Sequence, residues 1–159
     1  MPRSSTAILV VATLGLAGTQ RAYAQNPDTS GQVMFAVAAN SLTWAPIEVP
    51  GFPTGTKIAV IQRNPFETGL YTLRLSFPDG YRLPPHWHPM AENLTVISGT
   101  LQVGMGDRVD DSKLKTYQPG DFLFIPGTMP HFGGARGPTV IQLHGQGPFT
   151  INVVKTSSM

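Results

Sequence analysis

Residues 80–99 read GYRLPPHWHPMAENLTVISG, and the spacing of the polar residues in this stretch decides how the chain is interpreted. His86 and His88 are two positions apart. Successive side chains of a β-strand point to opposite faces, so both imidazoles lie on one face of a predicted strand and Trp87 lies on the other. A strand of this kind presents two nitrogen ligands to one metal ion. Glu92 follows beyond a short bend and can add an oxygen ligand.

The chain has two further histidines, His131 and His144. His131 follows the segment from Gly120 to Pro126 and can reach the same interior face from a different strand. Three imidazoles and one carboxylate suit a divalent first-row metal such as Mn, Fe, Co, Ni, Cu or Zn. A histidine taken singly is more often a structural hydrogen-bonding residue than a ligand, so the metal interpretation depends on the wider pattern.

Short apolar runs, separated by Gly, Pro, Asn and Asp, flank the histidines. With 17 glycines and 15 prolines in 159 residues, the chain holds too many helix breakers for a helical bundle. The spacing of the runs indicates one all-β domain, a sandwich or a barrel. The run Phe122–Ile125 is apolar at every position, which predicts burial between two layers or at a subunit contact. The predicted strands are Val33–Val37, Lys57–Gln62, Leu70–Phe77, Tyr81–His88, Asn93–Ser98, Leu101–Met105, Asp121–Ile125, Thr139–His144 and Phe149–Val154.

The composition excludes several classes of function. The absence of cysteine excludes disulfides, thiolate metal ligands and cysteine nucleophiles. If a leader containing Arg3 and Arg21 is removed, the 11 basic residues fall to nine and balance the nine acidic ones. A balanced chain without a basic cluster is a poor partner for nucleic acid. Neither a P-loop nor a G-x-S-x-G elbow is present.

Residues 1–24, MPRSSTAILVVATLGLAGTQRAYA, have the pattern of a signal peptide. Arg3 supplies a positive start, and residues 7–18 form an apolar run shorter than the roughly 20 residues that span a membrane. Residues 22–24 give the small-x-small pattern of a cleavage site. We therefore expect a cleaved leader, a flexible lead-in at 25–32, and a periplasmic or extracellular protein. A membrane anchor or a buried helix is the alternative reading of the run.

Two spaced motifs resemble those of the cupin superfamily. Gly80-x5-His86-x-His88-x3-Glu92-x6-Gly99 is similar to the first cupin motif without a gap or substitution, and Gly120-x5-Pro126-x4-His131 is similar to the second. The resemblance spans roughly residues 70–145. In the second motif, Thr128 stands where the family usually has glycine and Ala135 where it usually has asparagine. Neither position is a ligand in the family pattern, so only the turn before His131 is put in doubt.

The resemblance implies a jelly-roll β-barrel over residues 33–156 with one divalent first-row transition metal (Cu, Mn, Fe, Ni or Zn) per subunit. The implied ligands are His86, His88, Glu92 and His131. The motif glycines Gly80, Gly99 and Gly120 would mark tight turns or positive-φ positions.

Gln142 and His144 share strand parity near the end of the predicted barrel. If that face points inward, the two side chains line the metal pocket as a proton shuttle or substrate contact. The alternative is a surface or structural polar pair.

Four protein ligands leave two positions of an octahedron for water, O2 or a bidentate substrate. This favours an exported metal-dependent oxidoreductase that uses O2 or peroxide, acting on a carbohydrate or a small organic acid. A non-catalytic metal- or sugar-binding module, and a cupin lyase or isomerase, are the alternatives. Small single-domain cupins commonly pair, and the runs Phe122–Ile125 and Val33–Val37 offer surfaces for sheet extension between subunits, so we also expect a homodimer.

Overall fold

The computed structural model describes residues 34–155. The predicted leader and lead-in lie outside this range, as does Val33. The described residues contain nine strands and two three-residue 3-10 turns at Ala39–Ser41 and Asp111–Lys113. No helix among them is long and apolar enough to cross a membrane. The strands are β1 (Ala45–Pro46), β2 (Lys57–Gln62), β3 (Gly69–Phe77), β4 (Arg82–Trp87), β5 (Glu92–Met105), β6 (Lys115–Tyr117), β7 (Phe122–Ile125), β8 (His131–Gly147) and β9 (Asn152–Val153).

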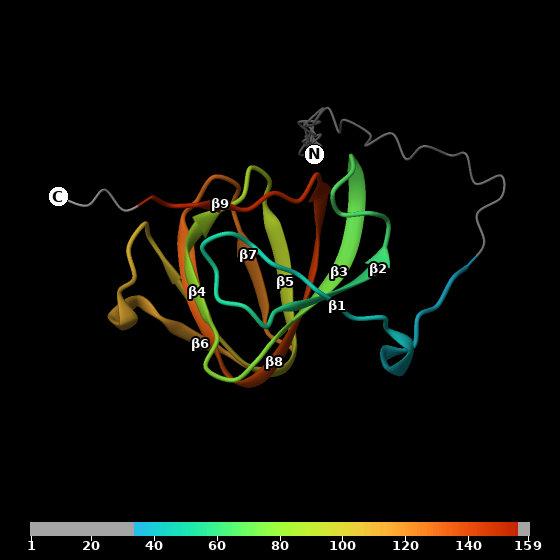
Figure 1. Cartoon of the computed structure of the whole chain (residues 1–159), viewed down its shortest axis with the longest axis horizontal. Helices are drawn as coiled ribbons and strands as arrows, with labels where there is room; N and C mark the ends of the chain where they lie inside the picture. Colours follow the sequence, from blue (N-terminus) through green and yellow to red (C-terminus); the bar gives the residue numbers. More distant parts are fainter. Residues whose placement is uncertain (1–33, 156–159) are drawn as a thin grey trace, which may run out of the picture. The chain divides into compact units, whose positions relative to one another are not determined.

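Every strand pairing is antiparallel, and the strands form one sheet in the order β1-β2-β3-β8-β4-β9. β5 leaves this path and pairs with β6, β7 and β8. The sheet curls around an interior, and the segment between β1 and β2 passes across it (Figure 1). The prediction of an all-β jelly-roll barrel is confirmed.

The two long strands, β5 and β8, hold the barrel together. The C-terminal half of β8 pairs with β3 at residues 139–147, while its first residues pair with β4, and β5 pairs with β8 along nearly its whole length. β8 thus changes partner from β4 to β3 along one edge, and register shifts in the β5–β8 pairing between Val96, Ser98 and Thr100 bend the strands locally. The separately predicted runs Asn93–Ser98 and Leu101–Met105 are thus one strand.

Side chains alternate between the interior and the surface. β3 alternates almost strictly, with Tyr71, Leu73, Leu75 and Phe77 buried. This period of two is the pattern of a strand with one face in the core. The remaining buried apolar residues of the cluster are Ile58, Tyr81, Leu94, Val96, Leu101, Val103, Leu123, Ile125, Ala135, Ile141, Leu143 and Phe149.

Three strand predictions need correction. Residues 34–37 of the predicted run Val33–Val37 form no strand and are exposed. The predicted run Phe149–Val154 shrinks to β9, because Phe149 turns into the core instead of continuing a ladder. β7 is not buried on both faces: Leu123 and Ile125 point inward, whereas Phe122 and Phe124 are 57% and 59% exposed.

Candidate metal centre

Three histidines from two neighbouring strands converge inside the barrel. His86 lies on β4, His88 follows directly after it, and His131 opens β8. β4 and β8 are paired with His86 opposite His131, which brings the two halves of the motif together. One nitrogen from each ring lies within 4.8 Å of the others, close enough for all three to hold one metal ion. The predicted convergence of these histidines is confirmed.

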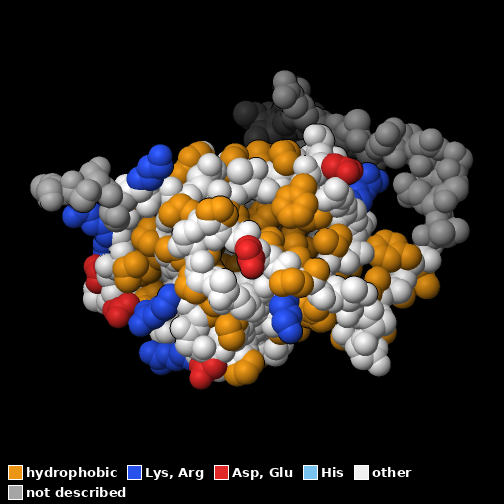
Figure 2. Space-filling view, in the orientation of Figure 1, with side chains coloured by type: hydrophobic (Ala, Val, Ile, Leu, Met, Phe, Trp, Pro, Cys, Tyr) orange, Lys and Arg blue, Asp and Glu red, His pale blue; other side chains and the backbone are white. Residues whose placement is uncertain are grey.

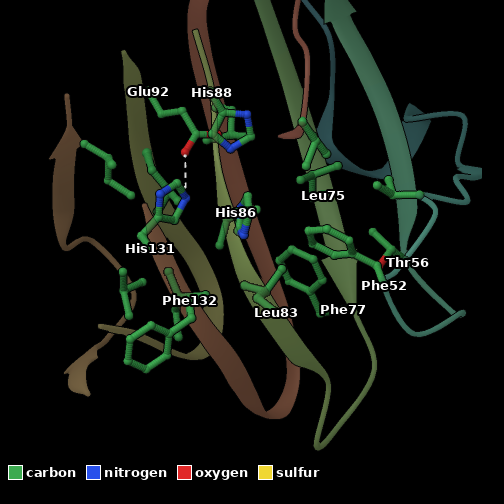
Figure 3. A pocket seen from close by; sticks show the side chains of 18 of the residues that line it. Phe52, Thr56, Leu75, Phe77, Leu83, His86, His88, Glu92, His131 and Phe132 are labelled. Atoms are coloured by element: carbon green, nitrogen blue, oxygen red, sulfur yellow. Dashed lines mark ion pairs between the residues drawn. The ribbon is translucent and has the colours of Figure 1, made fainter. Parts of the chain in front are cut away.

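Glu92, the first residue of β5, completes the cluster. One carboxylate oxygen lies 3.3 Å from His88 Nε2 and the other lies 3.5 Å from His131 Nε2. Figure 3 shows Glu92 above His131, with His88 beside it and His86 deeper in the pocket. The four residues are only 5–6% exposed. A buried carboxylate therefore faces ring nitrogens of the histidines that are predicted to share a metal ion with it.

Backbone carbonyl groups fix the orientation of each imidazole. His86 Nδ1 lies 2.7 Å from Pro84 O, His88 Nδ1 lies 2.8 Å from Thr150 O, and His131 Nδ1 lies 3.0 Å from Met129 O. A carbonyl oxygen only accepts hydrogen bonds, so each Nδ1 carries a proton and donates it. In a neutral ring the lone pair is then on Nε2. Metal-binding histidines are commonly held in this way, with one ring nitrogen donating to a carbonyl group and the other facing the ion.

Burial favours the neutral forms of His86 and His88, whereas the Glu92 carboxyl group stays ionised. Burial, reinforced by the neighbouring His131, lowers the pKa of His86 from 6.5 to about 3. Burial also lowers the pKa of His88, although Glu92 opposes this effect. Burial alone would raise the pKa of Glu92, but hydrogen bonding to His131 and electrostatic interaction with His88 and His131 outweigh it and hold the pKa below its ordinary value.

This donor set fits a metal ion. Three Nε2 lone pairs and a carboxylate converge, and acceptors that face one another repel unless a cation lies between them. For His131 Nε2 to donate to Glu92, the ring must be protonated on both nitrogens, so a proton can take the place of a metal there. Three imidazoles and one carboxylate suit a first-row divalent ion, but they do not select among Mn, Fe, Ni, Cu and Zn.

An apolar pocket opens beside the four polar residues. About 60 Å³ is open to the centres of water-sized molecules. Phe52 meets the His86 ring edge-on and Phe149 stacks on the His88 ring, each with ring centroids 5.1 Å apart. Figure 2 shows hydrophobic side chains gathered across the middle of one face of the molecule. The remaining wall residues are Ile47, Val49, Thr56, Leu75, Phe77, Tyr81, Leu83, Leu94, Leu101, Val103, Ile125, Phe132, Ile141, Leu143 and Ile151.

The turn before His131 departs from the usual motif in a visible way. Thr128 has a φ of +64°, although it is β-branched and such residues rarely adopt positive φ. Its N–H donates to His88 O at 2.7 Å, which ties the turn to the strand end that carries a ligand. The motif glycines Gly80, Gly99 and Gly120 all have positive φ, as predicted.

Gln142 and His144 do not line the pocket, and the expectation that they do is wrong. Their neighbours Ile141 and Leu143 line it instead, so the shared parity of the polar pair points outward. Arg74 Nε donates to Gln142 Oε1 at 3.1 Å, and His144 is exposed. The structure thus matches the alternative reading, a surface polar pair.

The sequence does not predict several other residues of the pocket wall. Ile47, Val49, Phe52 and Thr56 all come from the β1–β2 connection, where no motif or regular alternation marks them. Phe149 lay in a predicted strand but was not assigned to the site. The only available signal was the presence of large apolar residues in turn-rich sequence.

The family comparison agrees with this geometry. A family profile described as a cupin domain matches residues 73–144, from within β3 to within β8. All four clustered residues lie inside the matched range. The matched segment belongs to the cupin superfamily.

Curated relatives of this cupin are germin-like proteins from plants. "Germin-like protein subfamily 1 member 7" of Arabidopsis thaliana is 37% identical over 93 residues, covering 54% of this chain and 41% of the relative. "Germin-like protein 1-1" of Oryza sativa subsp. japonica is 28% identical over 109 residues, covering 64% and 50%. The cupin chain therefore spans half or less of the length of these relatives.

Solved structures share the fold at low sequence identity. The polyketide cyclase RemF from Streptomyces resistomycificus has a TM-score of 0.66 at 17% identity, covering 79% of this chain and 89% of that one. A putative acetylacetone dioxygenase from Methylibium petroleiphilum has a TM-score of 0.60 at 17% identity, covering 82% and 87%. Proteins named for such different reactions share this barrel, so the fold does not assign the reaction.

Proposed function

We propose that this cupin is a metal-dependent enzyme, most consistent with an oxidoreductase that uses O2 or peroxide. The observation that carries the proposal is the convergence of three Nε2 atoms and one carboxylate, all buried, beside an apolar pocket. Four protein ligands leave two octahedral positions for small molecules. A first-row divalent ion held by His86, His88, Glu92 and His131 would supply Lewis acidity or one-electron chemistry there.

The chain's own residues would prepare the site for that chemistry. The carbonyl groups of Pro84, Met129 and Thr150 hold the three imidazoles in the tautomer that directs Nε2 inward. Phe52 and Phe149 pack against two of the rings and limit the access of water. A dry site strengthens electrostatic interactions and prevents side reactions.

A second candidate is a non-catalytic module that binds a metal and no substrate. The small volume of the pocket favours it, because a site that only holds an ion needs no room for a reactant. A lyase or isomerase would use the same ligands as a Lewis acid without electron transfer.

The test is oxygen consumption, measured with an electrode after loading with Fe(II), Mn(II), Cu(II), Ni(II) or Zn(II) in turn and offering small neutral substrates, carbohydrates and organic acids. We expect a redox-active metal to support substrate-dependent uptake that His86→Ala abolishes. His144→Ala is the matched control, because it removes an exposed histidine and should retain activity. Stable metal binding with no uptake under any condition would contradict an O2-using oxidoreductase and leave a peroxide-using one and the other two candidates.

We also propose that the protein is exported, since residues 1–24 have the pattern of a cleavable leader. A periplasmic or extracellular location predicts a mature N-terminus at Gln25. N-terminal sequencing of secreted protein tests this, and an intact Met1 would contradict it.

A homodimer is proposed on the exposed face of β7. Phe122 and Phe124 stand side by side in phase on that strand, and large exposed apolar groups favour association. Light scattering should give twice the protomer mass, and Phe124→Lys should halve it. A monomeric mass for the unchanged protein at micromolar concentration would contradict the dimer.

A further inference from the structure

The Thr56 hydroxyl is buried without a partner. Thr56 is 7% exposed, and its Oγ1 has no hydrogen-bond partner among the described residues. Within residues 34–155, it is the only buried side-chain oxygen or nitrogen without a hydrogen-bond partner. A buried hydroxyl without a hydrogen bond destabilises the folded state, so such a group calls for a functional explanation.

The local fold turns the Thr56 side chain toward the interior. Thr56 directly precedes β2 and shares parity with the buried Ile58, so its side chain faces inward. Its carbonyl oxygen accepts a hydrogen bond from Ile47 N at 3.0 Å, which holds the backbone in place. Thr56 is one of the residues that line the cavity.

The cavity has two polar ends and an apolar middle. Figure 3 shows the Glu92–His131 pair at one side, Thr56 at the other, and Leu75, Phe77 and Leu83 among the side chains between them. Tyr81 also lines the wall, but its hydroxyl donates to Pro53 O at 2.8 Å. Among the described wall residues remote from the histidines, Thr56 is therefore the one whose side-chain oxygen has no hydrogen-bond partner.

The wall carries no positive side chain that could pair with an anion. Among the described residues lining the cavity there is neither lysine nor arginine, and Glu92 adds a negative charge. Burying a carboxylate substrate against this wall would leave its charge unpaired unless it lay on the metal. A sugar would leave several hydroxyl groups unpaired against the leucine, isoleucine and phenylalanine side chains.

The volume limits the size of the occupant. About 60 Å³ is open to the centres of water-sized molecules, which leaves room for a molecule larger than one water but only for a compact one.

We propose that the pocket binds a small neutral molecule with an apolar middle and an oxygen at each end. One oxygen lies at the histidine–glutamate cluster and the other hydrogen-bonds to Thr56. The inference rests on the proposed function in treating the cavity as the substrate pocket, and it replaces the expected carbohydrate or organic acid with a neutral substrate class. Thr56 lies outside the matched range 73–144, so it is a specificity residue that the family profile does not cover.

The test compares matched ligands on the wild-type protein and on Thr56→Val. The ligands are pentane-1,5-diol, pentan-1-ol and glutarate, which share a five-carbon chain but carry two hydroxyls, one hydroxyl and two carboxylates. Dissociation constants come from NMR chemical-shift titrations of the zinc-loaded and metal-free forms. Valine has nearly the shape of threonine without its hydroxyl.

We expect the diol to bind wild type more tightly than either other ligand. Thr56→Val should weaken diol binding about five- to tenfold, as for one lost hydrogen bond, and should leave pentan-1-ol unchanged. Thr56→Ser should restore diol binding. The melting temperature of unliganded Thr56→Val should stay the same or rise, because the variant loses an unpaired buried hydroxyl.

Tighter binding of glutarate, equal loss of both alcohols in Thr56→Val, or a lower melting temperature for that variant would each overturn the inference. The proposed function fails separately, if no metal binds. Thr56-dependent binding of the diol to the metal-free form would then still support the pocket assignment.

Discussion

Replacing Thr128 by glycine should stabilise the protein. Thr128 holds a φ of +64°, which costs an L-residue roughly 1–2 kcal/mol relative to glycine. Glycine offsets about 0.4–1 kcal/mol of this gain, because its greater conformational freedom stabilises the unfolded chain. No hydrogen bond of the Thr128 side chain offsets the strain among the described residues, and the N–H bond to His88 O survives the substitution. The free energy of unfolding should rise by about 1 kcal/mol, and Tm by roughly 3–6 °C.

The assay is urea denaturation of the metal-free protein, with thermal unfolding as a second measurement. Thr43→Gly is the matched control, because Thr43 is exposed and is not among the positive-φ residues. There the same substitution should lower the free energy of unfolding by about 0.4–1 kcal/mol. If Thr128→Gly destabilises the protein as Thr43→Gly does, the turn is not strained and the account of this motif departure is wrong.

Two further predictions concern the surroundings of the site. In Gly127→Ala, the new Cβ would lie 2.6 Å from Pro89 O, a backbone atom that cannot swing away. The variant should therefore lose about 1–3 kcal/mol of stability, measured by thermal unfolding. An unchanged Tm would refute the close contact. The low pKa of His86, about 3, means that between pH 6.5 and 3 the unfolded chain takes up a proton that the folded chain does not. The stability of the metal-free protein should therefore be complete above pH 6.5 and fall below it by about 1.4 kcal/mol per pH unit for this group, in urea titrations across pH. His144→Ala should keep this slope, and a flat profile in the unchanged protein would contradict the burial of a neutral His86.

Sequence reasoning succeeded where local spacing fixes geometry. The H-x-H spacing places two rings on one face in any strand, and the motif glycines predict positive φ wherever the chain must turn tightly. Partner strands were harder to predict. β8 runs through Gly133 and Gly134, which disfavour strands by propensity, yet pairing with β5 holds them in a ladder. The sequence therefore predicted most strands but not the long β8.

The orientation of β8 shows why the second half of the site was misplaced. The sequence gives Gln142 and His144 the same strand parity but leaves open whether their face points inward. Burying Ile141 and Leu143 instead removes two large apolar side chains from water, each worth roughly 1.5–3 kcal/mol. The hydrophobic pattern therefore decided the face. Thr56 and Phe52 were missed for a different reason, since their place in the wall depends on how the β1–β2 connection crosses the barrel.

Metal content tests the central claim most directly. Protein produced with its leader and purified without a nickel column should contain one first-row transition metal ion per chain, measured by inductively coupled plasma mass spectrometry. In His131→Ala the affinity for that ion should fall by more than the roughly 10–100-fold expected on removing a group that only hydrogen-bonds to a metal ligand. His144→Ala should retain it. A protein that stays metal-free after dialysis against all candidate ions, or equal metal content in His131→Ala, would contradict the metal centre.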